Sequence, residues 1–426
     1  MQIKRGAAII IGAVAVWMFS GCGQQPDAQG WRASQKEAFS AILREDRYLS
    51  VCDAKPLAEE VLRTKDSELM SRMLVRYAEN LANGCIDIEA FKRKQRARKS
   101  DDFKTDYEIY TQRVDRGLIL QQLRNGKSVA SILAPFVPKY REFSRLLNAY
   151  RTQKAAGLSP AKLAKIRLNI ERVKLMKPLK GDVYALINIP EFKVRIIENN
   201  VTKVAMRVVV GKRHMQTPIF SQTLQYIVLN PPWNVPPSIM RKEMLPKLLR
   251  NPNYLKAKGM EAHRTYDLNS PLVDLSQYDL REYMIEKNAT AYEKAHPKPM
   301  PFRFVQLPSK RNGLGRVKFL FPNKHSVYMH DTQSKYLFKR KYRAFSHGCV
   351  RLAKPNVMLK YLIEHYTNTP WSEAKKMYDS MQTHYIRVTR PLPVHTAYLT
   401  AYVDDDGTVK FFDDIYGYDR IQTLRR

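Results

Sequence analysis

The chain has 426 residues, of which 44% are hydrophobic and 10% are aromatic. This length exceeds that of one ordinary domain, and the apolar content excludes global disorder and a collagen-like fibre. Lys and Arg number 73 against 40 Asp and Glu, which gives a net charge of +33. Such a charge predicts an acidic partner, whether nucleic acid, an anionic membrane face or a carboxylate-rich polymer.

The first residues have the layout of a secretory signal. Lys4 and Arg5 precede an uncharged stretch over 6–21, whose apolar part is shorter than the ~20 residues that a spanning helix needs. The sequence Met-Phe-Ser-Gly-Cys over 18–22 resembles a bacterial lipobox, in which the cysteine is lipidated and becomes the new N-terminus. We therefore expect a lipoprotein signal peptide over 1–21, lipid on Cys22 and a polar linker over 22–30. A plain secretory signal cleaved elsewhere, or an uncleaved anchor, is the alternative.

Whether residues 1–21 are a lipoprotein signal or one of the alternatives, the segment predicts export of the protein. The expected location is the cell envelope, on the periplasmic side, with a lipid anchor holding the chain to a membrane. An exported bacterial protein rarely meets DNA, so we expect no nucleic-acid partner. The basic charge would then face anionic lipid headgroups or an acidic wall polymer.

Four cysteines are present, and two of them form a candidate disulfide. If Cys22 carries lipid and Cys349 carries out chemistry, Cys52 and Cys85 remain as one pair, 33 residues apart. In an oxidising compartment, a bridge closing such a loop contributes ~3–4 kcal/mol. Two buried, reduced thiols are the alternative.

Residues 31–178 show helical periodicity without a convincing two-residue alternation. Apolar residues recur at spacings of three and four, as in Leu69, Met73, Tyr77 and Leu81. This predicts an all-α N-terminal domain. The expected helices cover 34–43, 57–62, 67–81, 86–94, 113–123, 128–133, 139–150 and 160–173.

The pattern changes at residue 180, and residues 180–426 are predicted to form a β-rich domain with helices after Cys349. Between 238 and 313 the strand pattern lapses, and the sequence is polar, prolyl and helical in places. A long insertion of this kind predicts a lid over an active site. Strands are expected at 183–189, 192–198, 204–210, 224–230, 317–321 and 326–330, with a last hairpin of 397–403 and 409–412.

Two short motifs hold residues suited to nucleophilic catalysis. Tyr328-Met329-His330-Asp331-Thr332 ends a predicted strand, and His330 precedes Cys349 by 19 positions. A cysteine becomes a nucleophile when a nearby imidazole holds it as thiolate, and His330 and His347 are both candidates. Gly348 allows a close backbone approach, and N–H groups of this turn are candidate oxyanion donors.

The combination of His330 with Ser346-His347-Gly348-Cys349-Val350-Arg351 resembles the signature of the L,D-transpeptidases, which have a YkuD-type catalytic domain. Other segments resemble the large, multi-domain branch of this family, and the resemblance covers about residues 180–426. In that branch the insertion before the catalytic histidine forms a substrate-capping subdomain, which fits 238–313. The other segments that resemble this branch are 188–192, 208–212, 217–218, 233–238, 315–319 and 414–417.

The resemblance implies an α+β fold, in which an all-α N-terminal domain precedes a β-rich catalytic domain with a helical capping insertion. It implies that Cys349 is the nucleophile, that His330 is the general acid and base, and that the backbone carbonyl of Asp331 orients His330. The implied reaction joins donor and acceptor stem peptides of peptidoglycan by third-to-third cross-links, without cofactor or metal. Acylation of Cys349 by carbapenems is also implied.

Five further residues are candidates for oxyanion or substrate binding. Arg351 either binds a substrate carboxylate in a bidentate manner or pairs with a structural acid. His347 either tunes the thiolate or packs beneath the turn, and Ser346 is expected to cap that turn. Gly348 supplies the close approach, and Tyr328 shares a strand face with His330.

Three other functions remain open. Water as the acceptor would make the protein an L,D-carboxypeptidase, which the motifs do not distinguish from a transpeptidase. A zinc hydrolase could use His325, His330, His347 and Cys349, although their spacing matches no known ligand pattern, and His325 is otherwise expected to be an exposed loop residue. The third function is a non-catalytic, wall-binding lipoprotein.

Overall fold

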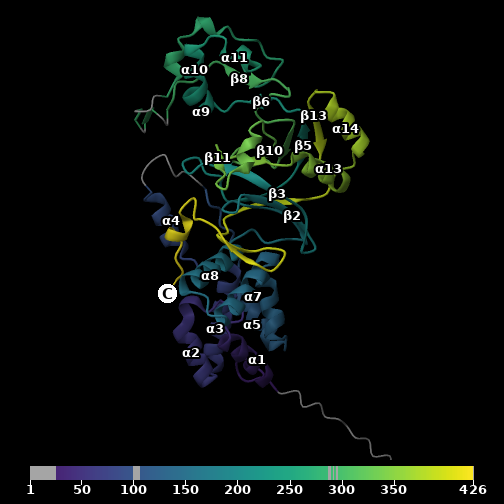
Figure 1. Cartoon of the computed structure of the whole chain (residues 1–426). Helices are drawn as coiled ribbons and strands as arrows, with labels where there is room; N and C mark the ends of the chain where they lie inside the picture. The colour runs from purple at the N-terminus through teal and green to yellow at the C-terminus, as the bar shows by residue number, and fades with distance from the viewer. Residues whose placement is uncertain (1–24, 99–105, 286–288, 291, 294–295, 426) are drawn as a thin grey trace, which may run out of the picture.

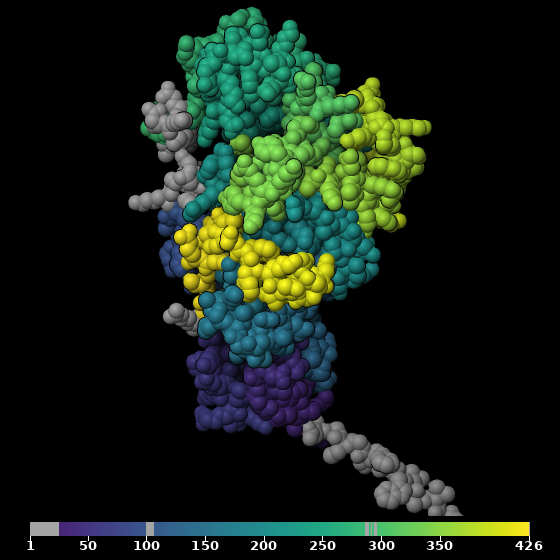
Figure 2. All heavy atoms as spheres, viewed as in Figure 1, coloured from purple at the N-terminus to yellow at the C-terminus, as the bar shows by residue number. Residues whose placement is uncertain are grey.

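The computed structural model describes residues 25–98, 106–285, 289–290, 292–293 and 296–425. The predicted signal peptide and Cys22 lie outside these residues. Three layers follow one another along the molecule, with helices at the base, a large sheet in the middle and a small cap at the top (Figures 1 and 2). Within the described part of the chain, no helix is both long and apolar enough to cross a membrane.

The N-terminal region is helical, as its periodicity predicts. The helix starts are set by local chemistry: Asp66 accepts hydrogen bonds from the N–H groups of Glu68 and Leu69, and Pro160 occupies the first turn of its helix. The helices are α1 (Ala33–Arg44), α2 (Lys55–Thr64), α3 (Ser67–Asn83), α4 (Ile88–Arg96), α5 (Arg116–Arg124), α6 (Val129–Leu133), α7 (Arg141–Ala155) and α8 (Pro160–Lys174).

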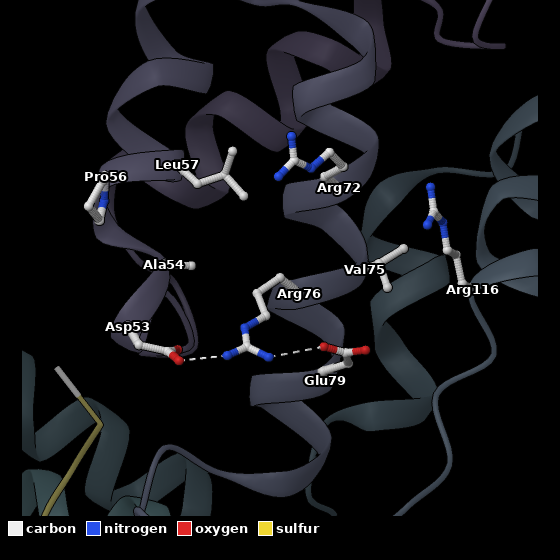
Figure 3. Close-up of a pocket in the computed structure, with 9 residues that line it drawn as sticks. All are labelled: Asp53, Ala54, Pro56, Leu57, Arg72, Val75, Arg76, Glu79 and Arg116. Atoms are coloured by element: carbon white, nitrogen blue, oxygen red, sulfur yellow. Dashed lines mark hydrogen bonds and ion pairs between the residues drawn. The ribbon is translucent and has the colours of Figure 1, made fainter.

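A disulfide joins Cys52 and Cys85 in this region. Next to Cys52, a hollow of about 490 Å³ opens between α2, α3 and α5. On its floor, the Arg76 guanidinium contacts Asp53 at 2.6 Å and Glu79 at 3.4 Å (Figure 3). The salt bridge to Asp53 thus fixes the segment that carries Cys52 against α3.

The central sheet has eleven strands within the described residues, in the order β13-β5-β9-β10-β12-β3-β2-β1-β14-β4, with β11 pairing to β3. Among the described strands three pairs are parallel, namely β1 with β14, β10 with β12 and β11 with β3, and the other pairs are antiparallel. The strands are β1 (Val183–Asn188), β2 (Lys193–Glu198), β3 (Val201–Gly211), β4 (Ser221–Thr223), β5 (Tyr226–Leu229), β9 (Val317–Leu320), β10 (Met329–His330), β11 (Ala344–Ser346), β12 (Val350–Leu352), β13 (His384–Arg387) and β14 (Pro393–Ala397).

The strand predicted over 326–330 is reduced to Met329–His330, which corrects the expectation that Tyr328 and His330 share one face of a five-residue strand. Ser326 has φ of 55°, a left-handed conformation that breaks a strand. Helices α13 (Pro355–Tyr366) and α14 (Trp371–Asp379) follow Cys349 as predicted, and they cover one side of the sheet (Figure 1).

The helical base and the sheet share one hydrophobic core. Its members come from α1, α3 and α7 and also from the sheet, where Tyr184, Leu186 and Ile197 are buried against the helices. The hairpin of β15 (Ala401–Val403) and β16 (Val409–Phe411) adds Tyr402 to this core. After α15 (Tyr418–Ile421) the chain returns to the base, where the N–H of Arg425 donates to the carbonyl of Cys85 at 2.8 Å. The sequence boundary near residue 180 is therefore not a boundary between separate cores.

The insertion forms a small unit with its own hydrophobic cluster, which includes Met240, Leu245, Phe302 and Phe304. It contains α9 (Pro237–Ile239), a π-helical segment (Met240–Met244), α10 (Leu245–Arg250) and α11 (Tyr254–Ala257). It also contains a three-stranded sheet of β6 (Trp233–Asn234), β8 (Arg303–Gln306) and β7 (Met260–His263). We predicted no strands between 238 and 313, because β7 and β8 are only four residues long and pair across more than 40 residues.

Candidate active site

Cys349 and His330 are brought together by the pairing of β10 with β12. These two strands are parallel neighbours, with Met329 opposite Val350 and His330 opposite Arg351. Cys349 stands at the start of β12, in the tight turn that leaves β11. The topology thus places two residues 19 positions apart in sequence at adjacent positions in space.

A cleft of about 760 Å³ lies between the cap and this part of the sheet. Its floor includes six predicted site residues, and its opposite wall is built from the cap, including Pro237, Glu243 and Tyr254. The six are Tyr328, His330, Ser346, His347, Cys349 and Arg351. The cap therefore covers the predicted nucleophile, as a lid would.

His330 is buried, with 4% of its surface exposed. Its Nδ1 donates a hydrogen bond to the backbone carbonyl of Asp331, which is the orienting contact that the family resemblance implied. Because a carbonyl only accepts, this contact places the proton on Nδ1 and leaves Nε2 as the acceptor in the neutral ring. Burial lowers the pKa of His330 to about 3, and the nearby charges of Arg351 and Lys318 add to this effect. The imidazole is therefore neutral at pH 7 and able to take a proton.

The thiol of Cys349 is half-buried and contacts groups other than His330. Its Sγ donates to the carbonyl of Ser326 at 3.8 Å, and the hydroxyl of Tyr328 also contacts it. Burial raises the pKa of Cys349, an effect that the nearby charges of Lys318 and Arg351 oppose. Among the described residues no hydrogen bond joins Sγ to His330. We expected a resting thiolate held by the imidazole, whereas burial of both groups favours a neutral thiol beside a neutral imidazole.

The turn that carries Cys349 is held from both sides. Ser346 Oγ donates to the carbonyl of Cys349 at 2.6 Å and accepts from the N–H of Gly348 at 3.2 Å, so Ser346 caps the turn as expected. Thr217 Oγ1 donates to the carbonyl of Gly348 at 2.7 Å. The Gly348 N–H, which we expected to act as an oxyanion donor, is thus already engaged. Gly348 has φ of 117°, a conformation that favours glycine.

His347 connects the catalytic turn to the cap. Its Nε2 lies 2.6 Å from Glu243 Oε1, which belongs to the π-helical segment of the insertion. Neither of the roles that we considered for His347 includes this contact. Burial lowers the pKa of His347, and the carboxylate of Glu243 opposes that shift. The pair is therefore a charge-assisted hydrogen bond that fastens the cap over the cleft.

Replacing Glu243 by glutamine should loosen the cap. Glutamine keeps a carbonyl oxygen that can accept from His347 Nε2 but lacks the charge, which makes such a bond about twice as strong, so amide hydrogen exchange over residues 237–250 should speed up several-fold. The matched control is Glu261→Gln, because Glu261 makes a similar contact of 2.9 Å with His263 inside the cap. Equal exchange rates over 237–250 in Glu243→Gln and wild type would show that this contact does not hold the cap.

Arg351 and Asp331 differ in their partners. Within the described ranges no carboxylate pairs with Arg351, and its Nε is buried without a hydrogen-bond partner, which favours a substrate carboxylate over a structural acid.

The Asp331 carboxylate, for which we had predicted no role, accepts from the N–H groups of Arg316 at 2.9 Å and Thr332 at 2.7 Å. It also binds Lys335. Asp331 therefore fixes the loops on both sides of His330.

His325 is not the exposed loop residue that we expected. Only 9% of its side chain is accessible, and it contacts Asp106 at 3.2 Å and Glu108 at 3.3 Å, both from the segment between α4 and α5. In the part of the chain that the structure describes, no group of three or more His, Cys, Asp and Glu side chains is arranged to hold a metal ion. The four residues of the zinc alternative are therefore not arranged as a ligand set.

Comparison with known proteins supports the resemblance that the motifs indicated. Residues 182–383 match the L,D-transpeptidase catalytic domain, YkuD. A Haemophilus influenzae protein named "Putative L,D-transpeptidase" is 30% identical over 258 residues, which cover 60% of this chain and 48% of that protein. This part of the chain therefore carries a YkuD-type L,D-transpeptidase catalytic domain, as its motifs predicted. It spans about half the length of the curated relative that it matches.

Solved structures of low overall similarity bear the same family name. An L,D-transpeptidase from Mycobacterium smegmatis is 12% identical with a TM-score of 0.22, over 51% of this chain and 58% of that one. L,D-transpeptidase 3 from Mycobacterium tuberculosis, in complex with a faropenem-derived adduct, is 10% identical with a TM-score of 0.22, over 51% and 60%. An Enterococcus faecium L,D-transpeptidase mutant is 9% identical with a TM-score of 0.21, over 76% and 82%.

Three residues at the site were missed by the sequence analysis. Thr217 and Lys318 lie in segments that resemble the family, but nothing in the sequence singled them out. Glu243 is 104 positions from His347, and only the docking of the cap brings the two together.

Proposed function

We propose that this protein is a periplasmic peptidoglycan L,D-transpeptidase that forms third-to-third cross-links through an acyl-enzyme on Cys349. The observation that carries this proposal is the placement of Cys349 beside His330 and Arg351 on the floor of a capped cleft. A nucleophile, a neutral base with a fixed tautomer and an unpaired guanidinium are the groups that acyl transfer to a carboxylate-bearing peptide requires.

The first half-reaction forms a thioester. Cys349 Sγ attacks the carbonyl carbon of the amide between the third and fourth residues of a tetrapeptide stem, and His330 Nε2 takes the thiol proton. The C–N bond then breaks, and the amine of the terminal D-alanine leaves with the proton from the imidazolium.

The second half-reaction resolves the thioester. The side-chain amine of the third residue of another stem attacks the thioester carbon while His330 takes a proton from that amine. The C–S bond breaks, and Cys349 regains its proton from the imidazolium. The cap excludes water, the competing acceptor, until the amine arrives.

The charge of the cleft supports an acidic substrate. Five of the described lining residues are cationic and one, Glu243, is anionic. Stem peptides carry several carboxylates, which such a lining attracts. The five cations are Lys247, Lys258, Arg311, Lys318 and Arg351.

Product analysis tests this function. Purified protein is incubated with disaccharide-tetrapeptides, and the products are separated by mass. Cross-linked dimers are the expected result, whereas tripeptides alone would make the protein an L,D-carboxypeptidase. The absence of both products, together with an unmodified Cys349 after carbapenem treatment, would support the non-catalytic alternative.

The proposal also includes lipidation of Cys22 and attachment to the periplasmic face of a membrane. Several acyl chains together with a basic surface would hold the protein firmly. In membrane fractionation of cells, Cys22→Ala should move the protein from the membrane fraction to the soluble fraction. An unchanged distribution would contradict the lipid anchor.

A further inference from the structure

Two cations flank His330 in a single row across three strands. Lys318 on β9 is directly opposite His330 on β10, and His330 is directly opposite Arg351 on β12. Residues that are opposite one another in a sheet project from the same face. All three side chains line the cleft, whereas their sequence neighbours Phe319 and Met329 are buried in the core on the other face.

Lys318 has a half-buried ammonium without a counter-ion. No described residue forms an ion pair with it, and its Nζ lies 4.0 Å from the ring centroid of Tyr328. Burial lowers the pKa of Lys318, and a thiolate at Cys349 would oppose this shift. Burying an ammonium without a counter-ion costs free energy. A negative charge that forms at a nearby nucleophile would offset this cost.

Burial opposes a thiolate at Cys349, and the Gly348 N–H is engaged by Ser346 Oγ, so a nearby cation would stabilise negative charge there. Tyr328 contacts both Cys349 and Lys318, so the ammonium lies behind the phenol that contacts the thiol.

We propose that Lys318 is a positioning residue of this site, whose ammonium stabilises the negative charge that forms at Cys349. It acts through the field across the cleft and through the Tyr328 ring that it contacts. The row Lys318–His330–Arg351 thus has two functions, since both cations favour the thiolate and both favour the neutral form of the imidazole between them. The inference rests on the proposed cysteine chemistry, but its test needs no transpeptidation.

The test measures the rate at which iodoacetamide alkylates Cys349 as a function of pH, by mass analysis of the peptide that contains it. In Lys318→Met the inflection of the profile should move to higher pH by about one unit, so that the rate below the inflection falls about tenfold. Lys318→Arg, which keeps the charge, should retain most of the wild-type rate. The control is Lys376→Met, which removes the same charge from the exposed side of α14 and should match wild type.

The wild-type protein offers a second measurement. Anionic iodoacetate should react faster relative to neutral iodoacetamide at Cys349 than at a free thiol, and added salt should reduce this advantage. If Lys318→Met does not fold, Lys318→Gln keeps most of the side-chain length and should lose part of the iodoacetate advantage. A folded Lys318→Met or Lys318→Gln with the wild-type pH profile and iodoacetate ratio would overturn the proposal. Normal alkylation in wild type without any cross-linked or trimmed product would instead contradict the proposed function alone.

Discussion

Replacing His330 by glutamine should slow the acylation of Cys349 by a carbapenem by about a thousandfold. Proton transfer by a positioned side chain contributes ~10²–10⁴ to such a rate, and glutamine cannot accept the thiol proton. Alkylation of the same thiol by iodoacetamide should remain nearly unchanged. The reason is that the resting thiol contacts Ser326 and Tyr328 instead of the imidazole.

The pH dependence of the alkylation rate distinguishes a neutral thiol at rest from a thiolate that is paired with an imidazolium. Because burial raises the pKa of Cys349 and lowers that of His330 to about 3, the alkylation rate of wild type should keep rising through the alkaline range. A thiolate held by an imidazolium would already be present at neutral pH, and its reactivity would fall only under acidic conditions. His365→Gln, on the exposed side of α13, is the control for histidine loss. A parallel loss of alkylation and acylation in His330→Gln would show that the two residues are paired at rest.

Replacing Gly211 by alanine should destabilise the protein and inactivate it. A Cβ at this position would lie 2.2 Å from the carbonyl oxygen of Met215 and 2.6 Å from the amide nitrogen of Thr217. These are backbone atoms that cannot rotate away, so we expect a loss of about 3 kcal/mol and a fall in Tm of ~3–4 °C. Thr217 would move with the backbone, and its hydroxyl would no longer hold the carbonyl of Gly348.

The matched control is Gly181→Ala. A Cβ there meets no atom within 4 Å, so thermal melting and carbapenem acylation should stay close to wild type. Melting temperatures of the two variants, measured side by side, decide the matter. If Gly211→Ala has the same melting temperature as wild type, the backbone around Thr217 is more adaptable than these contacts indicate.

Long periodic segments were predicted well, because their pattern repeats over several turns or pleats. Helix α3 and strands β1 and β2 lie within a few residues of the expected ranges. Strands β4, β11 and β12 have three residues each and were missed, since they owe their form to neighbours far away in sequence. Cys349 and His330 could be identified because their motif is specific, and the structure places them on adjacent strands.

The environment of these residues could not be predicted. The engaged N–H of Gly348, the contact of His347 with Glu243 and the row that contains Lys318 all depend on tertiary packing. The neutral state of the thiol depends on burial, which the motif does not encode. A sequence motif thus identifies the reacting atoms, whereas the fold determines their charge.

The core shared by helices and sheet has a consequence for the synthesis of this protein. Helices α1 to α8 are complete once residue 174 has been made, but their apolar face is covered by strand β1 and by residues as late as Val403. The apolar surface of the helical base therefore stays exposed until more than half of the chain has been synthesised after it. Such long-range closure is slow and exposes the nascent chain to aggregation, so we expect the base and the sheet to complete their folding together and late.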